Sequence, residues 1–360
     1  MTSNLIHKLG NVKIHYFSGT GNAKNVANWI GEKIQPQCIN LQIKNIATYG
    51  SEKIDKKEIQ PTEFDNNSLV GFCYPTHGFN APPIILKYLW NFPRTKNHTK
   101  VFVINTRAGL KLSKIFLPGI SGLAIILPAI ILMLKGYRLV GYRSIDLPSN
   151  WISIHPGLKK KVVTSIFTRC KRITDGFSSK ILSSKKVHTG FWWLPLDLLL
   201  TPIAFGYYLY GRFALSKTFI STANCNSCGL CVENCPVNAI TMKDGKPFWS
   251  YKCESCMHCM NTCPSRAIET PHLFTALIWW FSFSILPILL VNLLTKINNF
   301  KGLFFSLSYD ILFLIISISI IFGSYRIMHK LMKYTFINRI IKYTSLTSYS
   351  FWRRYMAPKV

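Results

Sequence analysis

The stretch that decides the architecture is the cysteine run CNSCGLCVENCP at residues 225–236, which recurs as CESCMHCMNTCP at residues 253–264. Both runs have the spacing C-x2-C-x2-C-x3-C-P, and together they hold eight of the 11 cysteines. A zinc site uses isolated CxxC pairs and needs neither the third cysteine nor the proline. This spacing is instead the one that binds [4Fe–4S] clusters. The chain is therefore expected to carry two such clusters.

The ligands of the two clusters are expected to cross between the runs. The first three thiolates of a run can hold one cubane, and the fourth cysteine then binds the other cluster. Cluster one therefore takes Cys225, Cys228, Cys231 and Cys263, and cluster two takes Cys253, Cys256, Cys259 and Cys235. We expect a small α+β two-cluster ferredoxin domain at residues 217–271. The remaining Cys38, Cys73 and Cys170 are expected to be buried as small hydrophobic side chains.

Near the N-terminus, a short apolar run at residues 12–17 is followed at once by SGTGNA at 18–23. Apolar residues then recur at helical spacing from Lys24 to Ile34. This order predicts a strand, a glycine-rich turn and a helix. Hydroxyls and backbone N–H groups at the start of a helix bind anions, so the turn is a candidate phosphate site. No GxGxxG or GxxxxGK[ST] motif is present, which argues against dinucleotide binding and nucleotide hydrolysis.

Further strands and helices alternate up to about residue 186. We expect strands at 69–74, 101–105 and 137–145, and helices at 84–90 and 158–182. This alternation predicts an α/β domain at residues 10–186 with a doubly wound parallel sheet. The uncharged stretch 115–134 lies between two strands of this sheet, so a single membrane span would separate them. We interpret it as a crossover helix whose outer face contacts the membrane or another apolar segment.

The first domain resembles flavodoxin, because Ser18 and Thr20 match two hydroxyls of that family's FMN-phosphate loop. The third hydroxyl position is Ala23, where one hydrogen bond is lost. The resemblance, over about residues 12–185, implies FMN, bound outside the carboxyl ends of the strands. Its implied binding residues are Ser18, Gly19, Thr20, Gly21, Asn22, Ala23, Thr76, His77, Gly78, Phe79, Asn80, Asn105, Thr106, Arg107, Gly109, Asn150 and Trp151. Among them, His77, Phe79 and Trp151 are candidates to stack on the flavin ring.

Two apolar stretches, 272–295 and 302–325, predict a transmembrane helical hairpin. The tail at 326–360 holds eight basic residues and no acidic residue. The positive-inside rule places it, and with it the cofactor domains, on the cytoplasmic side of the inner membrane. A reducing compartment argues against a disulfide framework. The linker at 187–216, which is apolar and rich in aromatic residues, is expected to lie in the membrane interface.

The net charge of +29 is unevenly distributed. Residues 191–271 carry only +1, whereas residues 111–190 carry +12 and the tail is strongly basic. The basic blocks adjoin apolar stretches, which indicates a collar against anionic lipid rather than a nucleic-acid surface. A basic surface would also attract an acidic ferredoxin or flavodoxin as redox partner.

The domain order is similar to that of flavodoxin–ferredoxin fusion proteins, although their linker is polar and they lack the hairpin. The resemblance implies electron transfer between FMN and the clusters and leaves the substrate open. Two classes of function remain. The protein is either an electron carrier that supplies a membrane partner or an oxidoreductase that itself reduces a lipophilic substrate, such as a quinone, at the flavin.

Overall fold

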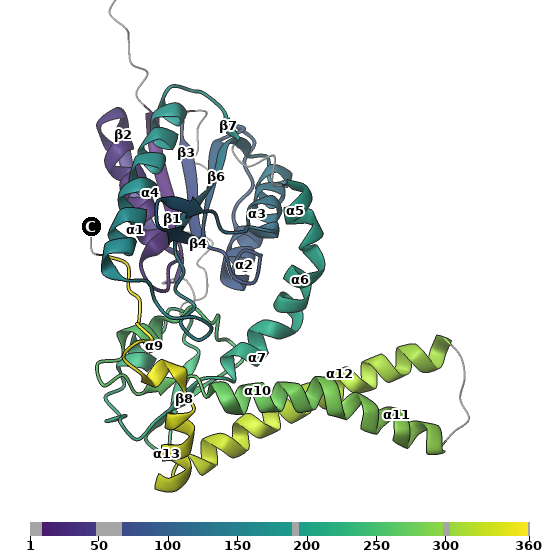
Figure 1. The fold of residues 1–360 in the computed structure, drawn as a ribbon. Coiled ribbons are helices and arrows are strands. Elements are labelled where there is room, and N and C mark those ends of the chain that lie inside the picture. Colours follow the sequence, from purple (N-terminus) through teal and green to yellow (C-terminus); the bar gives the residue numbers. More distant parts are fainter. Residues whose placement is uncertain (1–8, 48–66, 189–193, 298–302, 359–360) are drawn as a thin grey trace, which may run out of the picture.

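The computed structural model describes residues 9–47, 67–188, 194–297 and 303–358. The N-terminal half forms a parallel sheet in the order β2-β1-β3-β4-β6-β7, with β5 pairing antiparallel to β4 (Figure 1). Its strands are β1 (Leu9–Tyr16), β2 (Cys38–Asn45), β3 (Leu69–Pro75), β4 (Lys100–Leu112), β5 (Ile115–Leu117), β6 (Arg138–Pro148) and β7 (Val187–His188). A central order of 2-1-3-4-5, counting only the long parallel strands, is that of a flavodoxin-like fold.

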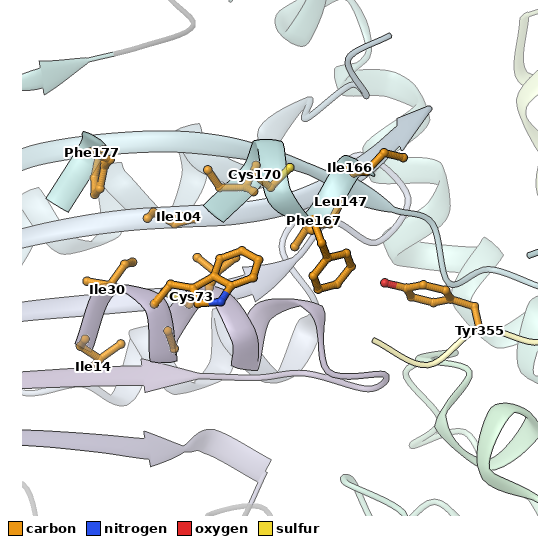
Figure 2. Packing of buried hydrophobic residues seen from close by; sticks show 14 of the residues in the cluster. Ile14, Ile30, Cys73, Ile104, Leu147, Ile166, Phe167, Cys170, Phe177 and Tyr355 are labelled. Atoms are coloured by element: carbon orange, nitrogen blue, oxygen red, sulfur yellow. The ribbon is translucent and has the colours of Figure 1, made fainter. Parts of the chain in front are cut away.

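Helices cover both faces of the sheet, as right-handed crossovers between parallel strands require. One face packs against α1 (Asn22–Ile34) and α4 (Lys160–Leu182), and the other against α2 (Pro83–Asn91) and α3 (Leu123–Leu134). Figure 2 shows the first of these cores, which contains Ile14 and Ile104 of the sheet together with Ile30 of α1 and Phe177 of α4. Cys73 and Cys170 are buried in this core, and Cys38 is half-buried at the start of β2.

Two sheet predictions were wrong in detail. The edge strand β2 follows a short 3-10 turn, η1 (Gln35–Gln37), and was missed because half its residues are polar. The uncharged stretch 115–134 is not one helix. It begins with β5, which folds back on an extended β4, and only Leu123–Leu134 is helical. Pro118, Gly119 and Gly122 separate the two elements, and Gly122 has a φ of +54°. The helix does cross from β4 to β6.

The cysteine-rich unit is built on two small antiparallel pairs. β8 (Ile220–Ser221) pairs with β11 (Ile268–Glu269), and β9 (Ile240–Lys243) pairs with β10 (Lys246–Trp249). Short helices α8 (Leu230–Glu233) and α9 (His258–Thr262) lie within the two cysteine runs. Met257 and Met260 join the same buried cluster as Ile14 and Ile30, so the core of the sheet continues into this unit.

The segment between the two units is a string of short helices along one side of the sheet (Figure 1). It comprises α5 (Leu194–Leu199), α6 (Thr201–Gly206), the π-helix η5 (Tyr207–Gly211) and α7 (Arg212–Ser216). Leu199, Ile203 and Leu209 are more than half exposed on this string. The Asp197 carboxylate accepts a hydrogen bond from the Gly122 amide at 2.8 Å, which ties α5 to the start of α3.

The C-terminal part contains a helical hairpin that projects from the rest of the molecule (Figure 1). Its first arm is α10 (His272–Trp280), the π-helix η6 (Phe281–Ile285) and α11 (Leu286–Ile297), and its second arm is α12 (Leu303–Leu331). Residues 272–293 and 309–331 are each long and apolar enough to cross a membrane. Within the most apolar 18-residue stretch of each, only 17% and 22% of the residues, respectively, are buried. The described part of the chain thus has two candidate spans.

The chain after α12 folds back on the body of the protein. It forms α13 (Thr335–Tyr343) and the 3-10 turn η7 (Leu346–Ser348), and residues 352–358 then run across the cysteine-rich unit to the start of α1. The second apolar helix passes the expected boundary at 325, and the region expected as a basic tail is largely folded.

Candidate functional site

The turn at residues 18–23 has the geometry of an anion cradle. Gly21 adopts a φ of +99°, which glycine tolerates, and α1 begins at Asn22. The Gly21 amide donates a hydrogen bond to the Ser18 hydroxyl at 3.0 Å. No acceptor in the described residues takes a hydrogen bond from the amides of Gly19, Thr20, Asn22 or Ala23. Free amides at the start of a helix can bind an anion, so this turn, at the start of a 13-residue helix, is a candidate phosphate site.

A cavity of about 420 Å³ lies beside this turn, at the carboxyl ends of the strands. It is within the size range of small-molecule and cofactor sites. Twelve of the seventeen predicted FMN residues line it: Ser18, Gly19, Thr20, Asn22, Ala23, Thr76, Gly78, Phe79, Thr106, Arg107, Asn150 and Trp151. The cavity also has lining residues that were not predicted: Pro75, Ala108, Pro118, Gly119, Ile120, Pro148, Ser149, Ile154 and His155. Most of these residues are next to predicted ones in the sequence. The 118–120 loop was not predicted, because the stretch 115–134 was expected to be one helix.

The other five predicted residues lie outside the cavity lining, and four have evident structural roles. Gly21 shapes the turn, and the Asn80 side chain accepts a hydrogen bond from the Ala81 amide at 2.8 Å. The Asn105 side-chain amide donates a hydrogen bond to the Thr76 hydroxyl at 2.7 Å and thereby holds Thr76, which lines the cavity. Gly109 was expected in a loop, but β4 runs past it to Leu112. Gly109 pairs with Pro148 of β6, close against Asp146.

His77 is buried and is not among the residues that line the cavity. Its ring lies 6.1 Å from that of Trp151, which lies 5.6 Å from Tyr207 of η5. Within the described chain the Tyr207 hydroxyl has no hydrogen-bond partner, and the buried His77 ring faces the backbone of Glu254. Burial lowers the pKa of His77 to about 4, which keeps it neutral, and burial raises the pKa of Glu254 to about 8. The Glu254 carboxylate accepts a hydrogen bond from the Ile84 amide at 3.1 Å.

Arg107 lies at the same edge of the sheet. Its guanidinium pairs with the Asp146 carboxylate at 2.6 Å, and both side chains are largely buried. The Asp146 carboxylate also accepts a hydrogen bond from the Gly119 amide at 2.9 Å. The pair thereby fixes the 118–120 loop, which forms one side of the cavity mouth.

Each cysteine run contributes to a separate small cavity. Cys225, Cys228, Cys231 and Cys263 line one, together with Cys259 and Pro264. Cys235, Cys253, Cys256 and Cys259 line the other, together with Pro236. In both, the fourth cysteine of one run lies with the first three of the other, and the donors are thiols, which suits iron–sulfur clusters. Cys228 is exposed, whereas Cys256 and Cys259 are buried.

The second of these cavities abuts the turn at residues 18–23, the candidate phosphate turn. The Asn150 side-chain amide donates to the Thr20 hydroxyl at 2.9 Å and to the Cys256 carbonyl at 3.3 Å. The His258 ring Nδ1 donates to the Gly19 carbonyl at 2.5 Å. A Cβ on Gly19 would lie 2.4 Å from the Cys256 carbonyl oxygen, so the two loops are in direct contact.

Comparisons with known proteins agree with this division of the chain. Residues 224–268 match the family described as 4Fe-4S dicluster domain. The sequence has no match among curated proteins. The chain thus combines a 4Fe-4S dicluster domain with a flavodoxin-like sheet.

Several solved structures resemble about half of the chain. A flavodoxin from the domain Archaea is 15% identical, covers 48% of this chain and 98% of its own, and has a TM-score of 0.28. An azoreductase from Bacillus anthracis is 10% identical over 47% of this chain and 99% of its own, with a TM-score of 0.31. General stress protein 14 from Treponema denticola, solved with FMN, is 12% identical over 47% and 98%, with a TM-score of 0.31.

Proposed function

We propose that this protein is a membrane-anchored electron-transfer flavo-iron–sulfur protein that passes electrons between two [4Fe–4S] clusters and FMN. The crossed cysteine sets would hold the clusters, and the free amides of the phosphate turn would hold the FMN phosphate. When bound, the clusters supply one-electron chemistry and the flavin handles one or two electrons. The chain's own contribution is to position these groups and to exclude water.

The observation that carries this proposal is the contact between the Cys256 loop and the phosphate turn. Asn150 bridges the two loops, and Gly19 leaves no room for a side chain between them. The second set of cysteines therefore lies against the loops that would hold the flavin. The first set includes the exposed Cys228, which favours it as the side that a soluble donor reaches.

We propose that the donor is a soluble low-potential carrier, an acidic ferredoxin or flavodoxin. The strongly basic composition favours encounter with acidic proteins. The hairpin supports anchoring, because its apolar side chains are left exposed by the rest of the chain, including Leu277, Trp280 and Ile288. The basic residues after α12 favour a cytoplasmic orientation in the inner membrane.

The test uses the detergent-solubilised full chain, reconstituted with iron, sulfide and FMN. A reduced acidic ferredoxin should reduce the clusters, visible by EPR, and then bleach the flavin absorbance. Protein with intact clusters that neither retains nor takes up FMN would refute the proposal. Anchoring is tested by alkaline carbonate extraction of membranes, after which the chain should remain in the pellet.

A second candidate function is reduction of a lipophilic substrate such as a quinone at the flavin. The observation that favours it is that two of the residues lining the large cavity, Ile120 and Ile154, are exposed apolar side chains. Turnover of a quinone by the purified protein alone would select this candidate. Oxidation of ferredoxin only after a partner protein is added would select the carrier.

A further inference from the structure

The phosphate turn is held by a segment from the far end of the sequence. Residues 352–358, which we call the strap, leave the 3-10 turn η7 and end beside α1. Tyr355 is 3% exposed and enters the core between the sheet and α4, next to Phe167 (Figure 2). Trp352 is also buried, and its indole N–H donates to the Ile152 carbonyl at 2.6 Å.

Three hydrogen bonds join the strap to the turn and to the first turns of α1. The Ala357 amide donates to the Thr20 carbonyl at 2.9 Å. The Tyr355 hydroxyl donates to the Asn22 side-chain oxygen at 2.5 Å. The Asn25 side-chain amide donates to the Pro358 carbonyl at 2.8 Å.

Asn22 is the residue through which the strap reaches the start of the helix. Its side-chain amide donates to the Pro148 carbonyl at 2.8 Å, while its oxygen accepts from Tyr355. Both ends of the side chain are thus fixed, one by β6 and one by the strap. The Asn22 backbone amide is among those free to bind an anion. The direction in which the Asn22 backbone amide points therefore depends on the Tyr355 hydroxyl, which lies more than three hundred positions later in the sequence.

The strap is itself anchored to the cysteine-rich unit and to the loop after β6. The Arg354 guanidinium is largely buried, pairs with Glu269 at 3.0 Å, and donates to the Met260 and Ile268 carbonyls. Arg353 and Gly157 exchange two hydrogen bonds at 2.7 and 2.8 Å. Bending the phosphate turn would therefore require displacing a strap that is bonded on both sides.

We infer that the strap is part of the flavin phosphate site and that Tyr355 is a positioning residue for it. This inference rests on the proposed function, because it assumes that the turn binds the FMN phosphate. The strap holds Thr20 and Asn22 so that the free amides around them converge. None of residues 352–358 is among the residues that line the cavity. Loss of the strap should therefore reduce affinity for FMN but not for riboflavin, which lacks the phosphate.

The test compares FMN and riboflavin binding to flavin-depleted protein with its clusters intact. Tyr355→Phe removes one hydroxyl, and Asn25→Ala removes a second strap contact. Loss of one such hydrogen bond should weaken FMN binding about fivefold and leave riboflavin affinity unchanged. Tyr349→Phe is the matched control, because that exposed hydroxyl donates to the Tyr343 carbonyl, away from the turn.

Cluster EPR signals and circular dichroism of each variant check that it has folded. FMN affinity unchanged in both variants would overturn the inference, as would an equal loss of FMN and riboflavin affinity. Wild-type protein that binds neither flavin refutes the proposed function itself, so the two failures are distinguishable.

Discussion

Asn150 and Cys256 are joined by a hydrogen bond of 3.3 Å from the side-chain amide to the backbone carbonyl. Asn150 follows β6 of the flavodoxin-like sheet, and Cys256 belongs to the second cysteine run. The same amide reaches the Thr20 hydroxyl at 2.9 Å. One side chain thus connects the predicted phosphate turn to the predicted ligand loop of cluster two.

Gly19→Ala should separate the two loops. The new Cβ would lie 2.4 Å from the Cys256 carbonyl oxygen and 2.7 Å from its Cβ. Overpacking of this kind costs about 1–3 kcal/mol of stability. We expect stopped-flow measurements to show slower flavin reduction by the prereduced clusters. Gly176→Ala, in open space on α4, is the control and should not slow the reaction. Equal rates in the two variants would contradict the role of this contact.

Thr20→Ala should weaken FMN binding about fivefold, since one hydroxyl hydrogen bond is worth about 1 kcal/mol. The hydroxyl lies at the cavity and also accepts a hydrogen bond from Asn150. Fluorescence titration of flavin-depleted protein measures the change. Thr168→Ala removes an exposed hydroxyl on α4 and should leave the affinity as in the wild type.

Cys235→Ser should damage cluster two, and Cys263→Ser should damage cluster one, because the fourth cysteine of each run lies with the other run. EPR of the reduced protein, with iron analysis, separates the two losses. Cys38→Ser serves as control, since Cys38 lies in β2. If each substitution instead destroys the cluster of its own run, the crossed assignment is wrong.

Electron transfer from an acidic carrier should slow as salt is added. Screening shortens the Debye length from about 30 Å at 0.01 M to about 8 Å at 0.15 M ionic strength, which weakens steering by the basic surface. Reduction by dithionite, followed in parallel, corrects for effects of salt on the clusters themselves. A rate that is independent of salt with every acidic carrier tested would exclude such steering.

His15 should make the protein less stable in acid. Burial lowers its pKa to about 3, and its Nδ1 is hydrogen-bonded to the Tyr88 hydroxyl at 3.0 Å. An unfolded histidine takes up a proton below about pH 6.5, whereas the folded one does not, so stability falls as pH decreases. Between pH 7.5 and pH 5 this group should account for about 2 kcal/mol of lost unfolding free energy.

Urea unfolding at both pH values measures this effect. His15→Phe should show a smaller loss on acidification than the wild type. His98→Phe, at a residue outside the buried core, is the control and should behave like the wild type. Identical pH dependence in the wild type and His15→Phe would show that His15 does not contribute.

Where the sequence pattern was local, it predicted the structure well. The strand, turn and helix around Gly21 were expected within a few residues, because the apolar run, the glycines and the helical spacing follow one another directly. The cysteine spacing likewise identified the segment that matches the 4Fe-4S dicluster domain. Both features depend on residues that are close in sequence, which is where periodicity and spacing are informative.

The misses depend on pairing between distant segments. β4 includes Gly109 because β6 continues beside it as far as the Gly109–Pro148 pair, and it extends to Leu112 because β5 folds back and pairs with its last three residues. β2 is an edge strand whose partly exposed residues alternate weakly. The contact of Asn150 with Cys256, and that of Tyr355 with Asn22, join residues more than one hundred positions apart. No periodicity within a segment carries information of that kind.

The position of the strap also determines the order in which the protein can mature. Tyr355 and Ala357 are synthesised after both apolar helices, so a ribosome-bound chain that has completed the sheet still lacks the bonds to Thr20 and Asn22. Under our proposals, tight flavin loading would then follow placement of the hairpin rather than precede it. A chain that failed to complete its hairpin would remain poor in flavin, so electrons that reached its clusters would have no flavin to pass to.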